Sequence, residues 1–201
     1  SENPQYASIL KLSGETWEHV AKGVRNSVGF DFHPVTQKLF FTDNGRDWLG
    51  DDSPSCELNR VDEEGLFYGF PFQHAVNIKD PEFGDIQSGY DYVKPILELG
   101  AHVAPTGIAF YDNHHFPKEF QNNLFITLHG SWNRSEKVGY KVVRVTLDQV
   151  GEVVTSEDFI TGWLQGQNVL GRPSAPLVTS DGSLLISDDK ANVIYRISYT
   201  Q

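Results

Sequence analysis

Residues 39–43 read Leu-Phe-Phe-Thr-Asp, and the segments at 124–128 (Leu-Phe-Ile-Thr-Leu) and 184–188 (Leu-Leu-Ile-Ser-Asp) repeat the same pattern. Each copy follows an apolar stretch with a turn, and precedes a stretch in which a basic residue stands before an aliphatic one. The preceding stretches lie at 28–34, 107–112 and 176–182, and the following ones at 58–61, 142–145 and 194–197. Repeated short strands indicate a solenoid or a β-propeller, because a single unit cannot bury both faces of its sheet.

The sequence begins and ends within a repeat. Residues 8–12 match the third strand of the unit and residues 16–21 match the fourth, while 198–201 directly follow a third strand. We therefore expect an all-β chain of about three four-stranded blades, fewer than the roughly four to eight of a closed propeller. Such an open ring would leave unpaired strand edges at 8–12 and 193–199, which a partner segment should cover.

Composition limits the possible functions. With 201 residues, 39% of them hydrophobic and 12% aromatic, the chain can form a sizeable core. Its net charge of −11 argues against nucleic acid as a partner and suits cation binding. No stretch approaches the ~18 apolar residues of a membrane span. The single cysteine, Cys56, excludes a disulfide framework within the chain.

Two segments between the repeats are candidates for function. Residues 42–57 combine four Asp, one Asn, one Glu and two Gly, which could supply the oxygen ligands and the backbone freedom of a Ca²⁺ site. Asp and Gly also dominate ordinary β-turns, so both interpretations stay open. The second segment, 73–104, reads as a long irregular loop that lines a site, covers a neighbouring blade or contacts a second copy.

Seven short motifs then occur in a recognisable order. They are Gly-Val-Arg-Asn-Ser-Val-Gly-Phe at 23–30, Phe-Thr-Asp-Asn-Gly-Arg-Asp at 41–47, Glu-Leu-Asn at 57–59, Tyr-Gly-Phe-Pro at 68–71, Ala-Pro-Thr-Gly at 104–107, His-Gly-Ser-Trp-Asn-Arg at 129–134 and Gly-Arg-Pro at 171–173. Together they resemble the soluble pyrroloquinoline-quinone (PQQ)-dependent sugar dehydrogenases of the glucose/sorbosone dehydrogenase family, and most closely the sorbosone-dehydrogenase-like branch.

This resemblance extends over nearly the whole chain and implies a fold and an activity. The fold is a six-bladed β-propeller, of which residues 1–201 form the C-terminal part of a single domain. The activity is oxidation of an aldose or sorbosone-like sugar, with hydride transfer to the quinone of PQQ and with Ca²⁺ as a second cofactor. The expected partners are the sugar and an upstream half of the propeller or a second copy, and the expected location is extracellular or periplasmic.

The resemblance also implies cofactor-binding residues. Arg25 and Asn26 match an Arg-Asn pair that reaches the quinone, and a guanidinium such as that of Arg25 can act in catalysis by stabilising negative charge on a quinone oxygen. Arg172 matches a late arginine that pairs with PQQ carboxylates, a role suited to its bidentate fork. Taken alone, Arg25 could equally form a surface ion pair, and Arg172 could be a turn residue before Pro173.

Three further residues are candidates for the channel. Where some relatives have a lysine, this chain has His129 and Arg134, and the sequence does not decide which of the two faces inward. We expect His129 to act in catalysis and Arg134 to contact the cofactor. His102 is a candidate at the channel mouth. Isolated histidines are more often structural, hydrogen-bonded residues than catalytic ones.

The metal ligands implied by the resemblance include backbone oxygens. Two consecutive carbonyls that hold Ca²⁺ against the quinone correspond to Gly45 and Arg46, and a structural Ca²⁺ would involve Glu57 and the carbonyl of Tyr68. The chain departs from one branch of the family at Cys56, where that branch has an acidic residue. This departure weakens the case for the second ion.

A catalytic motif of the family is absent from the sequence. No Asp-His pair of the kind that carries the proton-accepting histidine occurs in residues 1–201. A positioned general base contributes roughly 10²–10⁴-fold, so we expect the segment alone to be a poor catalyst. Two alternatives stay open: a non-catalytic propeller module that binds carbohydrate or a protein, and a Ca²⁺-dependent lactonase, which would need metal-binding carboxylates converging from several blades.

Overall fold

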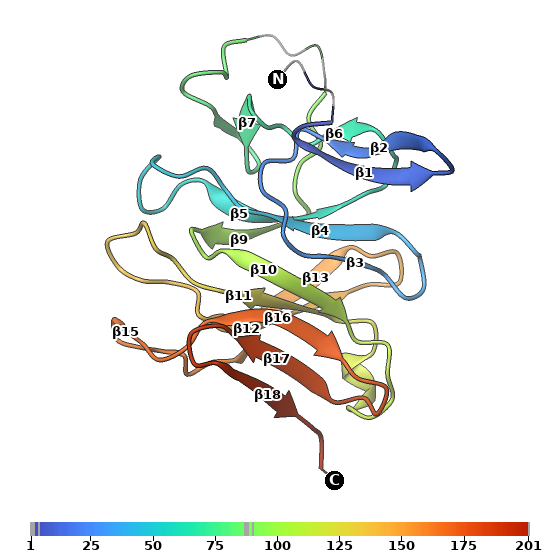
Figure 1. Cartoon of the computed structure of the whole chain (residues 1–201), viewed down its shortest axis with the longest axis vertical. Helices are drawn as coiled ribbons and strands as arrows, with labels where there is room; N and C mark the ends of the chain where they lie inside the picture. Colours follow the sequence, from blue (N-terminus) through green and yellow to red (C-terminus); the bar gives the residue numbers. More distant parts are fainter. Residues whose placement is uncertain (1–2, 4, 87–88, 90, 201) are drawn as a thin grey trace.

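The computed structural model describes the chain except residues 1, 2, 4, 87, 88, 90 and 201. Its regular structure is almost entirely β-strand (Figure 1), which confirms the all-β prediction. Four sheets follow one another along the chain and are stacked in that order between the two ends of the molecule.

Two complete four-stranded antiparallel sheets lie between two three-stranded ones. The first sheet contains β1 (Ser8–Ser13), β2 (Thr16–Lys22) and β6 (Leu66–Phe67). The second contains β3 (Phe30–Phe32), β4 (Leu39–Asp43), β5 (Ser55–Arg60) and β9 (Leu97–Ala101). The third contains β10 (Pro105–Phe110), β11 (Leu124–Leu128), β12 (Lys141–Leu147) and β13 (Val153–Ile160). The fourth contains β16 (Pro173–Val178), β17 (Leu184–Asp188) and β18 (Val193–Ile197).

The remaining regular elements are short. Two hairpins join β7 (Gln73–His74) to β8 (Ile78–Lys79) and β14 (Leu164–Gln165) to β15 (Asn168–Val169). The 3₁₀-helix η1 (Lys118–Phe120) is the only helix among the described residues. Across that part of the chain, no helix is long and apolar enough to span a membrane.

The prediction of one irregular loop over 73–104 is wrong. Strand β9 lies within this segment and pairs with β5 as the fourth strand of the second sheet, and the β7–β8 hairpin precedes it. The sequence did not predict β9 because this strand contains Glu98 and Gly100, residue types with low strand propensity. Its conformation depends on pairing with a distant strand. Before this segment, β6 joins the first sheet by a parallel pairing with β2.

The hydrophobic core lies in three layers, one between each pair of successive sheets. Because side chains alternate across a strand, Phe41 of β4 packs in the layer toward the first sheet, and Phe40 packs in the layer toward the third. On β11, Ile126 joins the same layer as Phe40, and Phe125 joins the layer toward the fourth sheet. All four side chains are fully buried. Burial of each contributes about 1.5–3 kcal/mol to stability.

A repeated polar contact joins neighbouring sheets at the inner strands. Thr42 Oγ1 donates to the carbonyl oxygen of Pro105 in the next sheet at 3.1 Å, and Thr127 Oγ1 donates to that of Ser174 at 2.9 Å. Beside these contacts a side chain on Gly29 would meet the Cα of Gly107 at 2.9 Å. Small residues here let the inner strands approach closely and fix the angle between sheets.

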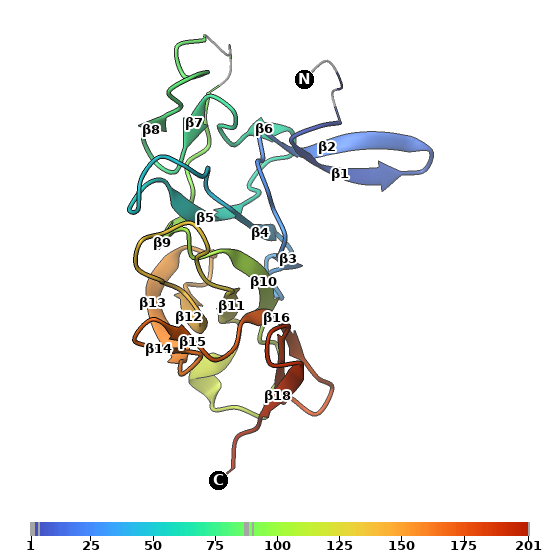
Figure 2. The same cartoon turned by 60° about the vertical axis from the view of Figure 1, so that its left-hand side comes forward.

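The ends of the chain lie at opposite ends of the stack (Figure 1), and the β1–β2 hairpin projects to one side (Figure 2). In the part of the chain that the structure describes, β1 pairs only with β2 and β18 only with β17. These are the two free edges that the repeat pattern predicts.

Candidate cofactor and metal site

The second strand of each of the last three sheets ends on the same side of the stack (Figure 1). The residues that follow β4, β11 and β17 are Asn44, His129 and Asp189, at equivalent places in the three repeats. Side chains from three sheets can therefore contribute to one surface.

A buried carboxylate at the end of β4 fixes the Arg25–Asn26 segment. Asp43 accepts hydrogen bonds from the backbone N–H of Arg25 at 2.8 Å and of Asn26 at 2.6 Å. Burial raises the pKa of Asp43 to about 6, although these backbone donors oppose the shift. Asp43 is therefore a structural anchor that holds both predicted cofactor residues in place.

Asp188, at the end of β17, anchors Arg172 in the same way. It accepts from the backbone N–H groups of Arg172 at 2.9 Å, Lys190 at 3.0 Å and Ala191 at 2.8 Å, and from the hydroxyl of Tyr195 at 3.2 Å. Burial opposes ionisation, but these donors outweigh it and lower the pKa of the carboxyl. The same device thus positions an arginine in two of the repeats.

A cavity of about 200 Å³ opens between the second and third sheets. It is lined by Arg25, Asn26, Val28, Asn44, Gly45, Asp47, Cys56, His102, Ala104, Thr106, Trp132 and Asn133. Four predicted site residues, Arg25, Asn26, Gly45 and His102, are thus brought together. The nitrogen Nε2 of His102 donates to the carbonyl oxygen of Gly50 at 2.7 Å, so its ring also braces the loop after β4.

Arg25 is held by two oxygens in this cavity. Its guanidinium donates to the carbonyl oxygen of Asn44 at 3.0 Å and pairs with Asp47 at 3.2 Å. Asp47 also accepts from the side-chain amide of Asn133 at 2.6 Å. Asp47 and Asn133 lie in the motifs at 41–47 and 129–134. The sequence does not predict their contact, because it joins loops 86 positions apart.

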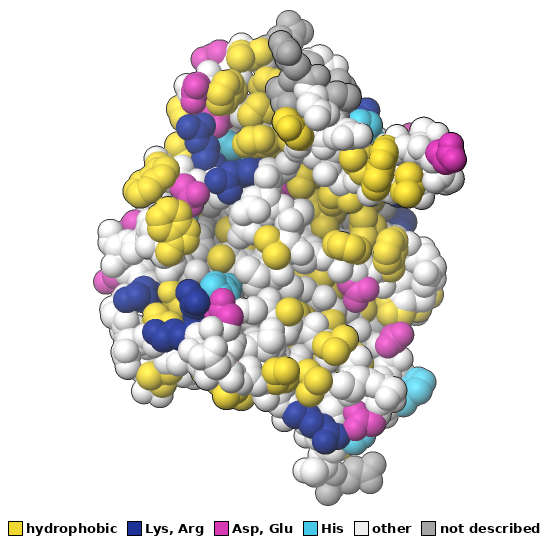
Figure 3. All heavy atoms as spheres, in the orientation of Figure 1, with side chains coloured by type: hydrophobic (Ala, Val, Ile, Leu, Met, Phe, Trp, Pro, Cys, Tyr) yellow, Lys and Arg dark blue, Asp and Glu magenta, His cyan; other side chains and the backbone are white. Residues whose placement is uncertain are grey.

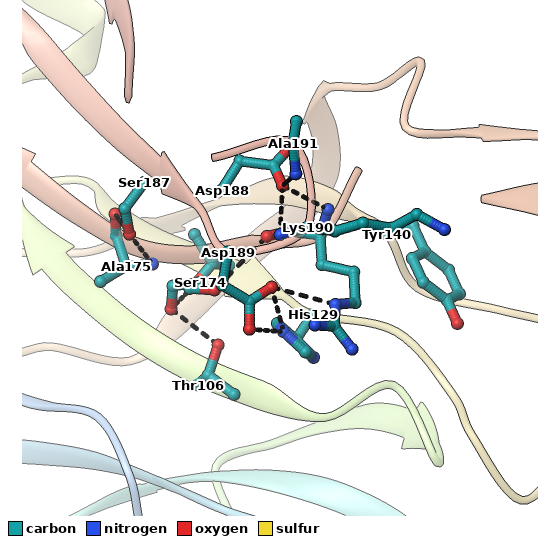
Figure 4. Close-up of polar contacts among 12 residues, drawn as sticks. Thr106, His129, Tyr140, Ser174, Ala175, Ser187, Asp188, Asp189, Lys190 and Ala191 are labelled. Atoms are coloured by element: carbon teal, nitrogen blue, oxygen red, sulfur yellow. Dashed lines mark hydrogen bonds and ion pairs between the residues drawn. The ribbon is translucent and has the colours of Figure 1, made fainter. Parts of the chain in front are cut away.

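A second polar cluster contains His129 and Asp189 (Figure 4). Asp189 lies 3.0 Å from Arg172 Nε, and both of its oxygens lie 3.1 Å from His129 Nε2. The cluster is linked to the cavity, because Thr106 Oγ1 donates to the carbonyl oxygen of Ser174 at 2.7 Å. Figure 3 shows Lys and Arg side chains gathered with a histidine and a carboxylate on this face.

The structure places His129 and Arg134 differently. His129 lies beside Arg172, as described above. Arg134 pairs with Asp52 at 2.8 Å and donates to the carbonyl oxygen of Asp51. The side chain of Arg134 therefore holds the loop after β4 and is not among the residues that line the cavity.

The carboxylates of the Asp-rich segment do not converge on one point. Asp43 and Asp47 bind the partners named above, Asp51 accepts from the backbone N–H of Ser135 at 3.1 Å, and Asp52 pairs with Arg134. Among the described residues, no three or more His, Cys, Asp or Glu side chains are grouped as metal ligands. A cation here would have to be held largely by backbone oxygens.

Gly45 and Arg46 have different surroundings. A side chain on Gly45 would meet the carbonyl oxygens of Ser55 and Pro54 at 2.9 and 3.0 Å, so this position lies in an oxygen-rich environment. The guanidinium of Arg46 pairs with Asp80 and turns toward the β7–β8 hairpin. Its side chain is therefore occupied with fastening that hairpin, and only its carbonyl is a candidate ligand.

The surroundings of Glu57 fit a hard cation. Its carboxylate is buried and accepts from the backbone N–H of Ala75 at 2.7 Å and from the amide of Asn59 at 2.9 Å. Burial, followed by the charge of Asp43, raises the pKa of Glu57 to about 7. The side-chain oxygen of Asn59 is buried with no hydrogen-bond partner. An unsatisfied oxygen beside a buried carboxylate suits Ca²⁺, which takes oxygen ligands.

The other predicted ligand, Tyr68, is turned into the core. Its hydroxyl donates to the carbonyl oxygen of Arg60 at 2.9 Å, and its ring packs edge-on against Phe41. Burial raises the pKa of the phenol. The side chain is therefore structural, and any role in metal binding rests on the backbone carbonyl, as the resemblance implies.

Comparisons with known proteins find relatives that cover nearly the whole chain. An uncharacterized protein of Borreliella burgdorferi is 43% identical over 193 residues, which cover 94% of this chain and 51% of that protein. The aldose sugar dehydrogenase YliI of Escherichia coli is 25% identical over 205 residues, which cover 98% of this chain and 48% of the enzyme. The holo form of the pyranose dehydrogenase PQQ domain from Coprinopsis cinerea matches 93% of this chain and 56% of its own, with a TM-score of 0.71 and 22% identity.

The chain thus spans about half the length of the curated relatives it matches. The likeness to the Coprinopsis domain shows a shared fold, which supports the propeller-type arrangement of the sheets. A profile of the family described as TrAA12-like matches residues 63–200, most of the sequence. The chain therefore belongs to the TrAA12-like family.

Proposed function

We propose that this chain is part of a PQQ- and Ca²⁺-dependent sugar dehydrogenase that oxidises an aldose or a sorbosone-like sugar to a lactone or an acid. In the complete protein it would supply about three blades of a six-bladed propeller. An upstream half or a second copy would supply the rest, and the protein would act outside the cytoplasm, in the periplasm or extracellularly. The activities printed for the Escherichia coli and Coprinopsis proteins support the reaction class.

One observation carries the proposal. Arg25 and Arg172 each precede the first strand of a sheet, and each is fixed through its backbone N–H by the buried carboxylate that ends the second strand of that sheet. In a chain with a net charge of −11, two positioned guanidiniums on one surface are suited to an anionic ligand. PQQ carries several carboxylates and fits that description.

The donor set also fits the chemistry. When bound, PQQ would supply a quinone that accepts hydride, and Ca²⁺ would supply a Lewis acid beside it. Arg25 would stabilise negative charge on an oxygen in the cavity, and Arg172, whose side chain is 42% exposed, would bind carboxylates. Asp189 would orient the ring of His129 and hold a proton on its Nε2.

The proton acceptor for the sugar hydroxyl would come from outside this chain. No histidine motif of the family's type occurs in the sequence, and a general base contributes roughly 10²–10⁴-fold. Residues 1–201 alone are therefore expected to give little or no turnover. Exposed apolar side chains on β3, namely Phe30 and Phe32, and Leu177 on β16 are suitable contacts for the remaining blades.

A structural Ca²⁺ at Glu57 and Asn59 is the second part of the proposal. The unpartnered oxygen of Asn59 and the raised pKa of Glu57 both indicate that positive charge would be favourable there. Calcium should therefore stabilise the chelator-treated protein against heat, and Glu57→Gln should weaken that stabilisation. A Glu98→Gln variant, which changes another carboxylate near Glu57, serves as the control. An equal response of both variants to Ca²⁺ would place the ion elsewhere.

The main test is a calorimetric titration of the complete, chelator-treated protein with PQQ in the presence and absence of Ca²⁺. We expect binding that depends on Arg25 and Arg172, followed by turnover when an aldose and an artificial electron acceptor are added. Failure of the folded protein to bind PQQ with Ca²⁺ present would exclude the dehydrogenase. The favoured function would then be a module that binds carbohydrate or a protein, the alternative to which the absent histidine motif points.

A further inference from the structure

Two tryptophans stand exposed beside the cavity. Trp48 follows β4 and is 79% exposed, and Trp132 follows β11 and is 71% exposed. Their ring centroids are 5.8 Å apart with the rings nearly perpendicular. Figure 3 shows hydrophobic side chains standing out at the edge of the molecule where the β4–β5 and β11–β12 loops lie. Exposed indoles beside a cavity are typical of ligand contacts, because a tryptophan normally buries its large apolar ring.

The loops that carry the two indoles are fastened to each other. Asn133 donates to Asp47 at 2.6 Å, and Arg134 pairs with Asp52 at 2.8 Å. The first bond joins the immediate neighbours of the two tryptophans, and both bonds join the loops of two different sheets. The backbone of Trp48 has a φ of +67°, a conformation that residues other than glycine rarely adopt. Strained positions that the surrounding contacts maintain are often found at binding sites.

Polar groups lie next to the aromatic pair. Trp132 lines the same cavity as Arg25, Asp47 and Asn133, which offer a guanidinium, a carboxylate and an amide. A pyranose has an apolar C–H face that packs on an aromatic ring and a rim of hydroxyls that pair with such groups. Because the two indoles are nearly perpendicular, a sugar ring could pack on the face of one indole and against the edge of the other.

We propose that Trp48 and Trp132 form a subsite for a pyranose ring of the substrate, and that this ring is a second sugar unit linked to the one that reacts. The inference rests on the proposed function, because it places the reacting sugar in the cavity of Arg25 and Gly45. The indoles lie at the rim of that cavity, so they contact the part of the substrate that extends outward. The substrate class is then a disaccharide or a longer oligosaccharide with the oxidised sugar at its reducing end.

The test compares single variants of the complete, PQQ-loaded protein. Trp48→Ala and Trp132→Ala should raise the KM for a disaccharide such as cellobiose or maltose at least tenfold, with a smaller rise for the corresponding monosaccharide. Trp48→Phe and Trp132→Phe keep an aromatic face and should recover part of the loss. Trp17→Ala is the matched control, because Trp17 is 54% exposed but lies on β2 in the first sheet.

A second readout does not require the cofactor. Titration of the PQQ-free protein with the same disaccharide should change tryptophan fluorescence, and either alanine variant should weaken that response tenfold or more. Disaccharide binding without PQQ binding would retain the subsite and reject the dehydrogenase. Equal disaccharide affinity in wild type and in both folded alanine variants, or equal losses for the disaccharide and the monosaccharide, would overturn the subsite.

Discussion

Asp43 and Asp188 occupy the same place in two repeats and do the same work, yet their electrostatic states differ. Both end the second strand of a sheet and accept the backbone N–H of an arginine. Asp188 has two further backbone donors and a tyrosine hydroxyl, which lower its pKa. Asp43 is similarly buried beside Glu57, and its pKa rises to about 6. Burial raises the pKa of both carboxyls and the hydrogen-bond donors lower it, so the balance between the two effects gives the opposite directions.

This difference separates an anchor whose carboxylate is fully hydrogen-bonded from one whose carboxylate is only partly compensated. Asp188 is satisfied by the protein alone, so its turn should be stable in all conditions near neutral pH. Asp43 and Glu57 place two poorly compensated carboxylates beside a cavity that contains Arg25 and Gly45. Buried carboxylates with shifted pKa values are common where a ligand or cation completes a site.

The largest expected effect comes from breaking the satisfied anchor. Asp188→Ala removes a carboxylate that accepts four hydrogen bonds and leaves buried N–H groups without partners. We expect the free energy of unfolding to fall by about 4 kcal/mol, measured by urea denaturation at pH 7. Asp189→Ala, one position along and half exposed, should cost less than about 1 kcal/mol. Similar losses in the two variants would contradict the anchoring role.

The second prediction concerns pH. The raised pKa of Asp43 means that the folded state holds a proton that the unfolded state has lost, so stability falls as pH rises from about 4 to about 6. A shift of about two units corresponds to about 3 kcal/mol. Asp43→Asn should make this fall in the free energy of unfolding smaller, as measured by denaturation without Ca²⁺ between pH 4 and 7. Part of the fall should remain up to about pH 7, because the pKa of Glu57 is also raised.

Asp188 should show the opposite sign. Because its pKa is lowered, its stabilisation is present above the ordinary pKa of an aspartate and is lost as pH falls below it. In Asp188→Asn, the free energy of unfolding should therefore change with pH as in the wild type between about pH 4 and 7. Below about pH 4, the variant should lack the part of the wild type's loss of stability that comes from protonation of Asp188. If the free energy of unfolding still fell as steeply between pH 4 and 6 in Asp43→Asn, the Asp43 carboxylate would not be its source.

The third prediction compares the two arginines in ligand binding. Arg25→Ala and Arg172→Ala should each weaken PQQ binding by about 1.5–3 kcal/mol, because each removes charge-assisted hydrogen bonds. Arg25 should have the larger effect, since its side chain is 23% exposed against 42% for Arg172 and is therefore less screened by solvent. Arg196→Ala, on an exposed arginine of the last strand β18, is the control for calorimetry. An equal loss in that variant would point to net charge as the cause.

The repeat pattern predicted the strands whose signal is local. Segments such as 39–43 and 184–188 are apolar runs bounded by turns, and they form β4 and β17 within the expected bounds. Strands β6 and β9 were not predicted because their conformation depends on pairing with distant strands. Sequence periodicity shows how a strand buries its faces, and it contains little information about an edge strand that is short or rich in polar residues.

The candidate site was predictable to a similar extent. The motifs located Arg25, Asn26 and Gly45, and His102 lies just before one of them; all four line one cavity. They could not show that Arg134 turns toward Asp52, because that pairing is made by two loops far apart in the chain. Composition also suggested a carboxylate cluster over 42–57, but hydrogen bonds to backbone and arginine partners draw those side chains apart.

The smallest effects should come from the hydroxyls that join neighbouring sheets. Thr42→Val removes a buried bond to Pro105 and should cost about 1 kcal/mol, whereas Thr127→Val should cost less, because the Ser174 carbonyl keeps the hydroxyl of Thr106. Ser187 takes the equivalent place on β17 but bonds within its own sheet, to Ala175. Ser187→Ala is therefore expected to change the urea midpoint least of the three. If it destabilised the protein as much as Thr42→Val, these hydroxyls would act within each sheet, and the contact between sheets would depend on apolar packing alone.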